Sequence, residues 1–266
     1  MTESAATILA DIREEAAAIG GAVLAAGLSA RLLGGLAVWL RCPSVHSGPF
    51  ARSYADLDFA VSKSSSPKFR ALLEARGYLP DKFFNGLHGA TRLYYQAPDA
   101  RWSVDIVIDE LSMSHSLDLR GQLDGPGPTI SLADLLLTKL QVWEINRKDL
   151  GDAVCVLADH QLAAAGPAAA ADPAATGSAD DDISLDRVSS VLGSDWGFCH
   201  TVQRNLGKVL ELWSAEPLPG APHDVQEQVR ALQSAIEAAP KSRSWRLRSR
   251  VGERVRWYET PVEVRH

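Results

Sequence analysis

The chain has 266 residues, 46% of them apolar, which suits one large or two modest globular domains and excludes a collagen-like or wholly disordered chain. Its formal net charge is -6, although residues 241–266 hold eight Lys or Arg against three Glu. A short basic end on an acidic body excludes a protein that coats nucleic acid along its whole length, but it allows a local contact with an anion.

The first elements in chain order are a helix over residues 4–19 and a short apolar strand over Ala30 to Leu33. The strand runs into Gly34 and Gly35, after which Leu36 to Leu40 resumes as a helix. Strand, glycine turn and helix is the order of a phosphate-binding element, because glycine lets a backbone N–H group approach an anion without a Cβ in the way. Most Gly-Gly pairs are simply turns, so both interpretations stay open.

The strand expected next is Tyr54 to Val61, with the sequence YADLDFAV. Apolar residues alternate there with Asp56 and Asp58, which is the period of a half-buried strand whose other face carries two carboxylates. Like charges about 6 to 7 Å apart along a strand repel each other. Either water screens them or a cation lies between them.

Ser66 to Gly77 is predicted to be an amphipathic helix, with Pro67 at its first turn and a glycine at its end. Two strands, Ala90 to Gln96 and Trp102 to Asp109, then form a predicted antiparallel hairpin. Asp105 and Asp109 share one face of the second strand. The pattern therefore places a third carboxylate, Asp105, on a strand that could lie beside the first, with Asp109 at the strand end as its alternative.

From Ser131 the chain is predicted to be helical, first over SLADLLLTKLQVWEI and then over residues 148–161. Residues 163–182 are dominated by Ala, Pro, Gly and Asp, which favours a flexible linker. Helices are expected again over residues 183–213 and 225–238, before a basic, aromatic tail. The tail could contact nucleic acid, or it could be the wet face of a strand or of a loose helix.

Three cysteines, Cys42, Cys155 and Cys199, form no CxxC pair, which favours small apolar fillers in a reducing cytoplasm over a disulfide framework or a zinc site. The N-terminus carries acidic residues where a signal peptide needs basic ones, so we expect no export signal. The apolar run over residues 20–40 is interrupted by an arginine, a serine and five glycines, so we expect buried core and no membrane contact, with a transmembrane span as the alternative. His88 and His115 have no partner at a metal-ligand spacing.

Asp56, Asp58 and Asp105 on one sheet face would suit Mg²⁺, a hard ion that takes oxygen ligands and leaves positions open for substrate phosphates. Two such ions about 3.5 to 4 Å apart could clamp the attacking and leaving oxygens of an in-line phosphoryl displacement. A cation of this kind would relieve the repulsion between the paired aspartates.

The order of Gly34-Gly35, the DLD strand and VDIVID around Asp105 resembles the DNA polymerase β-like nucleotidyltransferase superfamily. The later stretch TKLQVWEINRKDLGD, with Lys139 followed by the K-D-x-x-D of Asp149 and Asp152, is similar to the AbiEii-type toxin nucleotidyltransferases within it. The resemblance covers residues 30–160. The sequence departs from the superfamily's usual spacing by a longer loop between Gly35 and Asp56, and from its usual glycine motif by having Gly35 where serine is common.

The resemblance implies an α/β (α+β) fold, with a small mixed sheet, flanking helices and a helical C-terminal region. It implies a catalytic domain over 1–128, a helical segment over 129–162 that completes the active site, a linker over 163–182 and a C-terminal region over 183–266. The implied reaction moves a nucleoside monophosphate from an NTP to a hydroxyl. The acceptor would be the 3′ end of an RNA such as a tRNA, in a toxin-like role with an antitoxin protein as partner.

The resemblance also assigns roles to residues. Asp56 and Asp58 would hold the metals, and Asp105 would be the third ligand or the general base. Gly34 and Gly35 would carry the triphosphate on backbone N–H groups, Lys139 would neutralise phosphate charge, and Asp149 would orient that lysine or the acceptor. In the simpler interpretation Lys139 is a solvated helix residue and Asp149 and Asp152 stabilise a helix start.

Two other functions stay open at this point. The same chemistry could act on a small molecule such as an aminoglycoside or lincosamide antibiotic, which an acidic protein could receive. Alternatively, the chain could be a catalytically silent protein that binds a nucleotide or a partner protein and regulates it.

Overall fold

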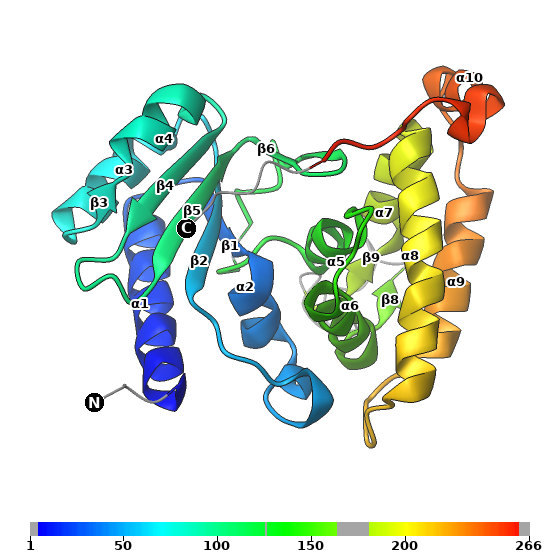
Figure 1. The fold of residues 1–266 in the computed structure, drawn as a ribbon, viewed down its shortest axis with the longest axis horizontal. Coiled ribbons are helices and arrows are strands. Elements are labelled where there is room, and N and C mark those ends of the chain that lie inside the picture. The colour runs from blue at the N-terminus through cyan, green and yellow to red at the C-terminus, as the bar shows by residue number, and fades with distance from the viewer. Residues whose placement is uncertain (1–4, 126, 164–180, 261–266) are drawn as a thin grey trace, which may run out of the picture. The chain divides into compact units, whose positions relative to one another are not determined.

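The computed structural model describes residues 5–125, 127–163 and 181–260, which belong to two compact units. Unit 1 covers residues 1–40, 51–111 and 118–130, and unit 2 covers residues 41–50, 112–117 and 131–266. Most of the predicted linker over 163–182 lies outside the described residues. The predicted fold class is confirmed, because a mixed five-stranded sheet comes early and the C-terminal half is mostly helical (Figure 1).

Unit 1 is built on one mixed sheet with the strand order β1-β2-β5-β4-β3. β2 and β5 are parallel, whereas the pairs β1/β2, β5/β4 and β4/β3 are antiparallel. The predicted hairpin of neighbouring strands is therefore confirmed as β4 and β5. The strand bounds are β1 (Ala30–Leu33), β2 (Asp56–Val61), β3 (Leu79–Pro80), β4 (Arg92–Gln96) and β5 (Ser103–Ile108).

One face of this sheet is the core of unit 1, because alternate residues of β2 and β5 are apolar and buried there. Phe59 of β2 contacts Phe69 of α3, with ring centroids 5.2 Å apart, so α3 covers that face. The opposite face carries Asp56, Asp58 and Asp105. The helices of unit 1 are α1 (Ala5–Ala25), α2 (Gly34–Arg41), α3 (Ser66–Ala75) and α4 (Lys82–His88).

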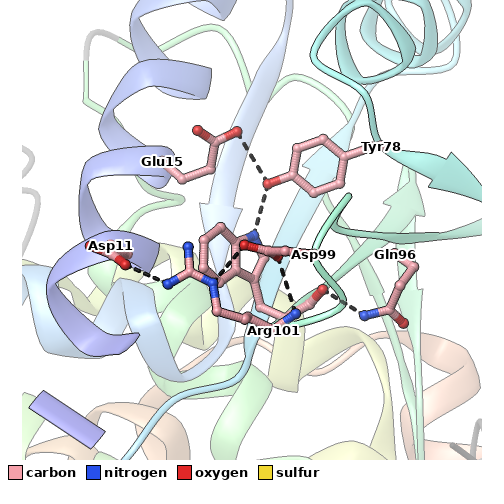
Figure 2. A network of polar contacts seen from close by, with 7 residues as sticks. Asp11, Glu15, Tyr78, Gln96, Asp99 and Arg101 are labelled. Atoms are coloured by element: carbon pink, nitrogen blue, oxygen red, sulfur yellow. Dashed lines mark hydrogen bonds and ion pairs between the residues drawn. The ribbon is translucent and has the colours of Figure 1, made fainter. Parts of the chain in front are cut away.

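A polar network joins α1 to the edge of the sheet (Figure 2). The Tyr78 hydroxyl accepts a hydrogen bond from Trp102 Nε1 at 2.8 Å and contacts a carboxylate oxygen of Glu15 at 3.1 Å. Arg101 pairs with Asp11 of α1 and with Asp99. These contacts satisfy polar groups at a partly buried junction, so they fix α1 against the β4–β5 hairpin that carries Asp105.

Unit 2 is a helical body that also contains the short β8 (Leu162–Ala163) and β9 (Ile183–Ser184) pair. Its 3-10 turns η1 (Pro43–Val45) and η2 (Gly48–Phe50) come from the loop after α2, and η3 (Gly252–Arg254) follows α10. The short strands β6 (Glu110–Ser112) and β7 (Ser116–Asp118) lie between β5 and α5 in the chain. The helices are α5 (Leu132–Leu140), α6 (Arg147–Asp159), α7 (Leu185–Ser194), α8 (Trp196–Ala215), α9 (Val225–Ala238) and α10 (Arg243–Val251).

The prediction of one continuous helix over 183–213 is wrong. The segment starts with the short strand β9, and two helices, α7 and α8, follow with Asp195 between them. Asp195 has an extended backbone and its side chain accepts a hydrogen bond from Phe198 N at 3.0 Å, so it ends α7 and caps α8. The tail forms a helix, α10, which settles the strand-or-helix alternative. Among the described residues, no helix combines the length and the apolar character that crossing a bilayer requires.

His115 is an ordinary buried residue of unit 2, and it predicts a pH dependence of stability. Its Nε2 lies 2.8 Å from Thr201 Oγ1, and its ring stacks on Phe198 at 5.1 Å. Burial lowers the pKa of His115 to about 4, below its ordinary value of 6.5, and the charge of Asp195 opposes this only in part. Between these values the unfolded chain binds a proton that the folded chain does not, so stability is complete above pH 6.5 and falls as the pH falls towards 4.

We expect the free energy of unfolding, measured by urea denaturation, to lose about 2 to 3 kcal/mol from this residue between about pH 7.5 and about pH 4.5. His115→Gln, which keeps a hydrogen-bonding group but cannot titrate, should remove that part of the pH dependence. His88→Gln at an exposed position is the matched control and should leave it intact. The same pH dependence in His115→Gln as in the wild type would contradict the assignment.

Candidate functional site

The strand register brings Asp58 and Asp105 together on the polar face of unit 1. β2 and β5 are neighbouring strands of the sheet (Figure 1) and run in parallel. Their register sets Asp58 opposite Asp105 and Asp56 opposite Ser103. Residues opposite each other on neighbouring strands lie about 5 Å apart and point to the same face. The sequence prediction that Asp105 lies on a strand next to the paired aspartates is therefore confirmed.

Arg92 of β4 holds the carboxylate of Asp105. Its Nε donates to Asp105 Oδ1 at 2.8 Å and to Oδ2 at 3.1 Å, and its Nη2 forms an ion pair with Oδ2. The side chains are 34% and 17% exposed, so the pair lies partly out of water. A two-pronged contact of this kind fixes the orientation of the carboxylate as well as neutralising it.

The electrostatics of this face centre on Arg92. Hydrogen bonds to Asp105 raise the pKa of Arg92 above its ordinary value against the effect of burial, and the charges of Asp105 and Asp58 add to the rise. Asp56 is exposed, whereas Asp58 and Asp105 are half-buried. The Asp56 carboxylate accepts a hydrogen bond from Ser103 Oγ at 2.7 Å. Arg92 thus binds Asp105 directly and also feels the charge of Asp58.

The glycine turn lies directly against Asp58. Gly34 has φ +74°, and a Cβ built on it would lie 1.9 Å from Asp58 Oδ2. Gly34 and Gly35 open α2, whose first N–H groups have no partner within the helix and carry the positive end of its dipole. The absence of a Cβ at Gly34 therefore lets the backbone of a potential anion site approach a carboxylate of the strand.

Arg52 adds a cation to the same turn. A Cβ on Gly35 would lie 2.4 Å from Arg52 Nη2, and the guanidinium stacks on the ring of Tyr54 at 4.3 Å. Gly35 thus leaves room for the Arg52 guanidinium, which a Cβ at this position would displace. Arg52 belongs to the loop that separates the glycine turn from β2, so the longer loop supplies a positive charge to the turn.

A Gly34→Ala substitution should cost stability through the contact with Asp58 as well as through its backbone angle. Gly27 is a matched control, because it has φ +60° and no atom lies within 4 Å of a Cβ built on it. Gly27→Ala should lower the free energy of unfolding by about 1 kcal/mol through the left-handed backbone alone. Gly34→Ala should cost roughly 2 to 3 kcal/mol, because Asp58 Cβ would also lie 3.0 Å away and rotating the carboxylate does not clear the space. If urea denaturation gave the same loss of unfolding free energy for both substitutions, the close contact between Gly34 and Asp58 would be contradicted.

Asp109 takes no part in the carboxylate group. It lies beyond the last residue of β5 with φ +63°, and its Oδ1 accepts a hydrogen bond from Lys63 N at 2.8 Å. Its side chain therefore ties down the turn after β2, at the end of the strand away from Asp56. Of the two alternatives on this strand, the structure places Asp105 beside Asp58.

Lys139 and Asp149 lie in unit 2, where α5 and α6 pack together. Lys139 Nζ lies 3.1 Å from Asp149 Oδ1 and 2.9 Å from Asp152 Oδ2. Burial lowers the pKa of Lys139, but the charges of Asp152 and Asp149 outweigh this effect and hold the pKa above its ordinary value. Lys139 is a buried cation between two carboxylates, and the interpretation as a solvated helix residue is wrong.

Asn146 completes this cluster at the start of α6. Its side chain accepts from Asp149 N at 2.9 Å, and its Nδ2 donates to Asp149 Oδ2 at 2.9 Å. Asp149 therefore has both a helix-start role and a contact with Lys139, as the two sequence interpretations separately proposed. Asp152 has its carboxylate 2% exposed and makes the shorter contact with the lysine.

Sequence reasoning missed Arg52 and Arg92. Arg92 precedes Tyr94 by two residues on the predicted strand before Asp105, so alternation could have placed it on the carboxylate face. The register that makes it the neighbour of Asp105 follows only from the hairpin pairing. No sequence signal links Arg52 to Gly35, because the contact depends on how a loop folds back.

Two of the three aspartates on this face are suited to bind a hard cation. Asp56 and Asp58 offer carboxylate oxygens on one face, and Mg²⁺ is commonly held by one or two carboxylates together with substrate phosphates. Asp105 is engaged by Arg92, and within the described ranges no group of three or more His, Cys, Asp or Glu side chains is arranged to hold a metal ion. The residues thus suit one ion bound by two carboxylates and a substrate phosphate.

The sequence matches no protein-family model, and no curated protein matches it significantly.

Proposed function

We propose that this chain is a Mg²⁺-dependent nucleotidyltransferase that moves a nucleoside monophosphate from an NTP to a hydroxyl acceptor. The observation that carries the proposal is the contact between the glycine turn and the DLD strand, where Gly34 has no room for a Cβ beside Asp58. This contact puts a backbone suited to phosphate next to carboxylates suited to a cation. Transfer of a nucleotide requires both beside the same phosphate chain.

In this proposal the triphosphate binds to the N–H groups of Gly34 and Gly35, with Arg52 as a neighbouring cation. Asp56 and Asp58 would hold the ion, which when bound would neutralise charge that develops on the phosphate oxygens. The acceptor oxygen forms a bond to the α-phosphorus as the bond to the bridging oxygen breaks, and pyrophosphate leaves. The hydroxyl proton goes to a carboxylate oxygen of Asp105, which Arg92 holds in place.

This assignment favours Asp105 as a general base over a third metal ligand. Arg92 contacts both of its oxygens, and each carboxylate oxygen has a further lone pair that can accept a proton. The same contact favours a second candidate function, a silent nucleotide-binding protein, because a carboxylate held by arginine leaves only two for the ion. The three cysteines are buried and free, in keeping with action in a reducing cytoplasm.

The test is transfer of label from an NTP that is radiolabelled on its α-phosphate. The full chain is incubated with Mg²⁺ and each NTP in turn, with total RNA or with a panel of hydroxylated antibiotics as acceptors. We expect label on one acceptor class and its loss when the cation is chelated. Nucleotide binding by calorimetry without transfer to either class would favour the silent protein and overturn the enzyme proposal.

A further inference from the structure

The outer face of α10 carries a row of arginines, which we call the arginine stripe: Arg243, Arg246 and Arg250, continued by Arg254 in η3. Spacings of three and four residues place them on one side of the helix, and all four are exposed. In the part of the chain that the structure describes, none of these guanidinium groups forms an ion pair or a side-chain hydrogen bond. Like charges at this spacing destabilise a helix, so an anionic partner bound to the stripe would stabilise α10.

Two other arginines of this segment, Arg248 and Arg256, make contacts within the fold. Arg248 donates to Gly252 O at 2.7 Å and to Val255 O at 2.6 Å, and it stacks on Trp196 at 4.9 Å. Arg256 stacks on Tyr258 at 4.6 Å. These two hold the chain after α10 in place, so the fold does not depend on the four residues of the stripe.

Local acids do not neutralise the stripe. Residues 241–258 contain seven Lys or Arg and a single acid, Glu253. Glu253 Oε1 lies 3.0 Å from His200 Nε2 and is thus directed to α8. The positive charge of the stripe is available for a partner outside the segment.

The inner side of α10 lines an aromatic cavity of about 460 Å³. It lies wholly within unit 2, and its walls combine aromatic rings with two arginines and two acids: Trp196, Trp245, Trp257, Tyr258, Arg248, Arg256, Asp195 and Glu259. Trp257 meets Trp196 edge to face with centroids 6.0 Å apart, which fixes its ring. Every nucleobase has a flat face that stacks on such rings, and a cationic surface beside aromatic rings is how proteins bind single strands.

We propose that α10 and this cavity bind single-stranded RNA, with the arginine stripe on backbone phosphates and an unstacked base in the cavity. The proposal goes beyond the transfer reaction, because this binding requires neither an NTP nor Asp58. An anionic membrane is disfavoured, since the exposed large apolar residues of α10 are only Leu247 and Val251. Trp245 is not available to a bilayer because it lines the cavity on the inner side.

The test measures binding of a fluorescein-labelled oligouridylate to the full chain by anisotropy at about 50 to 200 mM salt. Arg243→Gln/Arg246→Gln/Arg250→Gln should weaken binding at least about tenfold at the higher salt and reduce the slope of log K against log salt by about 2. Lys63→Gln/Lys68→Gln/Lys82→Gln makes the same change in net charge at exposed positions of unit 1 and should have little effect. Tyr258→Leu should weaken binding several-fold with the salt slope unchanged, because it removes an aromatic wall of the cavity and no charge.

Three results would overturn the proposal: no RNA binding by the wild type, equal loss in the arginine and lysine triple variants, or binding to phosphatidylserine vesicles without binding to RNA. Thermal denaturation establishes that each variant is folded. Asp58→Asn should bind the RNA as the wild type does. Transfer activity without RNA binding would therefore reject this inference alone, and RNA binding without transfer would reject only the enzyme proposal.

Discussion

Asp58→Asn should lower the rate of nucleotidyl transfer by at least about 100-fold while leaving the fold intact. Asparagine has the same shape but no charge, so it binds a divalent cation and the phosphates attached to it much less well. Asparagine also keeps the size and the polar character of the half-buried side chain, so β2 and its pairing with β5 should be retained. The rate is measured as label transferred at saturating NTP, and stability by urea denaturation.

Asp109→Asn is the matched control for that substitution. Asp109 lies beyond β5 in a left-handed conformation that asparagine also tolerates, and asparagine can still accept the hydrogen bond from Lys63 N. Its transfer rate should equal that of the wild type. If both variants lost activity equally, the loss would not be specific to Asp58. If Asp58→Asn were fully active, the proposed role of the DLD strand in binding the cation would be wrong.

Lys139→Met should lower the free energy of unfolding by about 3 to 5 kcal/mol. The substitution leaves Asp152 with its side chain 2% exposed and Asp149 close by, and neither then has the cation. A buried carboxylate without a counter-charge must either stay ionised at a high desolvation cost or take up a proton. Urea denaturation at neutral pH measures the loss.

A double variant separates the ion pair from the packing of the lysine stem. In Lys139→Met/Asp152→Asn one of the two stranded charges is gone, so the loss should be smaller than the sum of the two single losses by about 1 to 3 kcal/mol. Arg147→Met serves as a control, because the Arg147 to Glu216 pair is largely exposed and should contribute less than about 1 kcal/mol. Additive losses for Lys139 and Asp152 would contradict the buried pair.

These stability results also bear on the role of Lys139 in catalysis. The resemblance to toxin nucleotidyltransferases assigns the lysine to phosphate, whereas in unit 2 its ammonium lies between two carboxylates. A transfer rate that falls in Lys139→Met but recovers in the double variant would make Lys139 a positioning residue for the α5–α6 junction. A rate that stays low in both would support direct contact with substrate.

The sequence by itself determined the features that depend on local periodicity. Alternation in YADLDFAV put Asp56 and Asp58 on one strand face and Leu57 and Phe59 on the other, and the structure bears this out. Helical spacing found most of the helices, and the glycine pair marked the turn before α2. It did not find α4, whose seven residues are too few to repeat an apolar face.

Only the tertiary structure decided which groups meet. The hairpin register makes Arg92 the partner of Asp105, and the approach of α2 to β2 sets Gly34 against Asp58. The packing of α5 on α6 turns Lys139 from a surface charge into a buried cation with two partners. Periodicity is a property of neighbours in the chain, whereas the charge state and the partner of a side chain depend on residues brought close by folding, and for that reason the sequence identified the carboxylates but not the arginine that holds one of them.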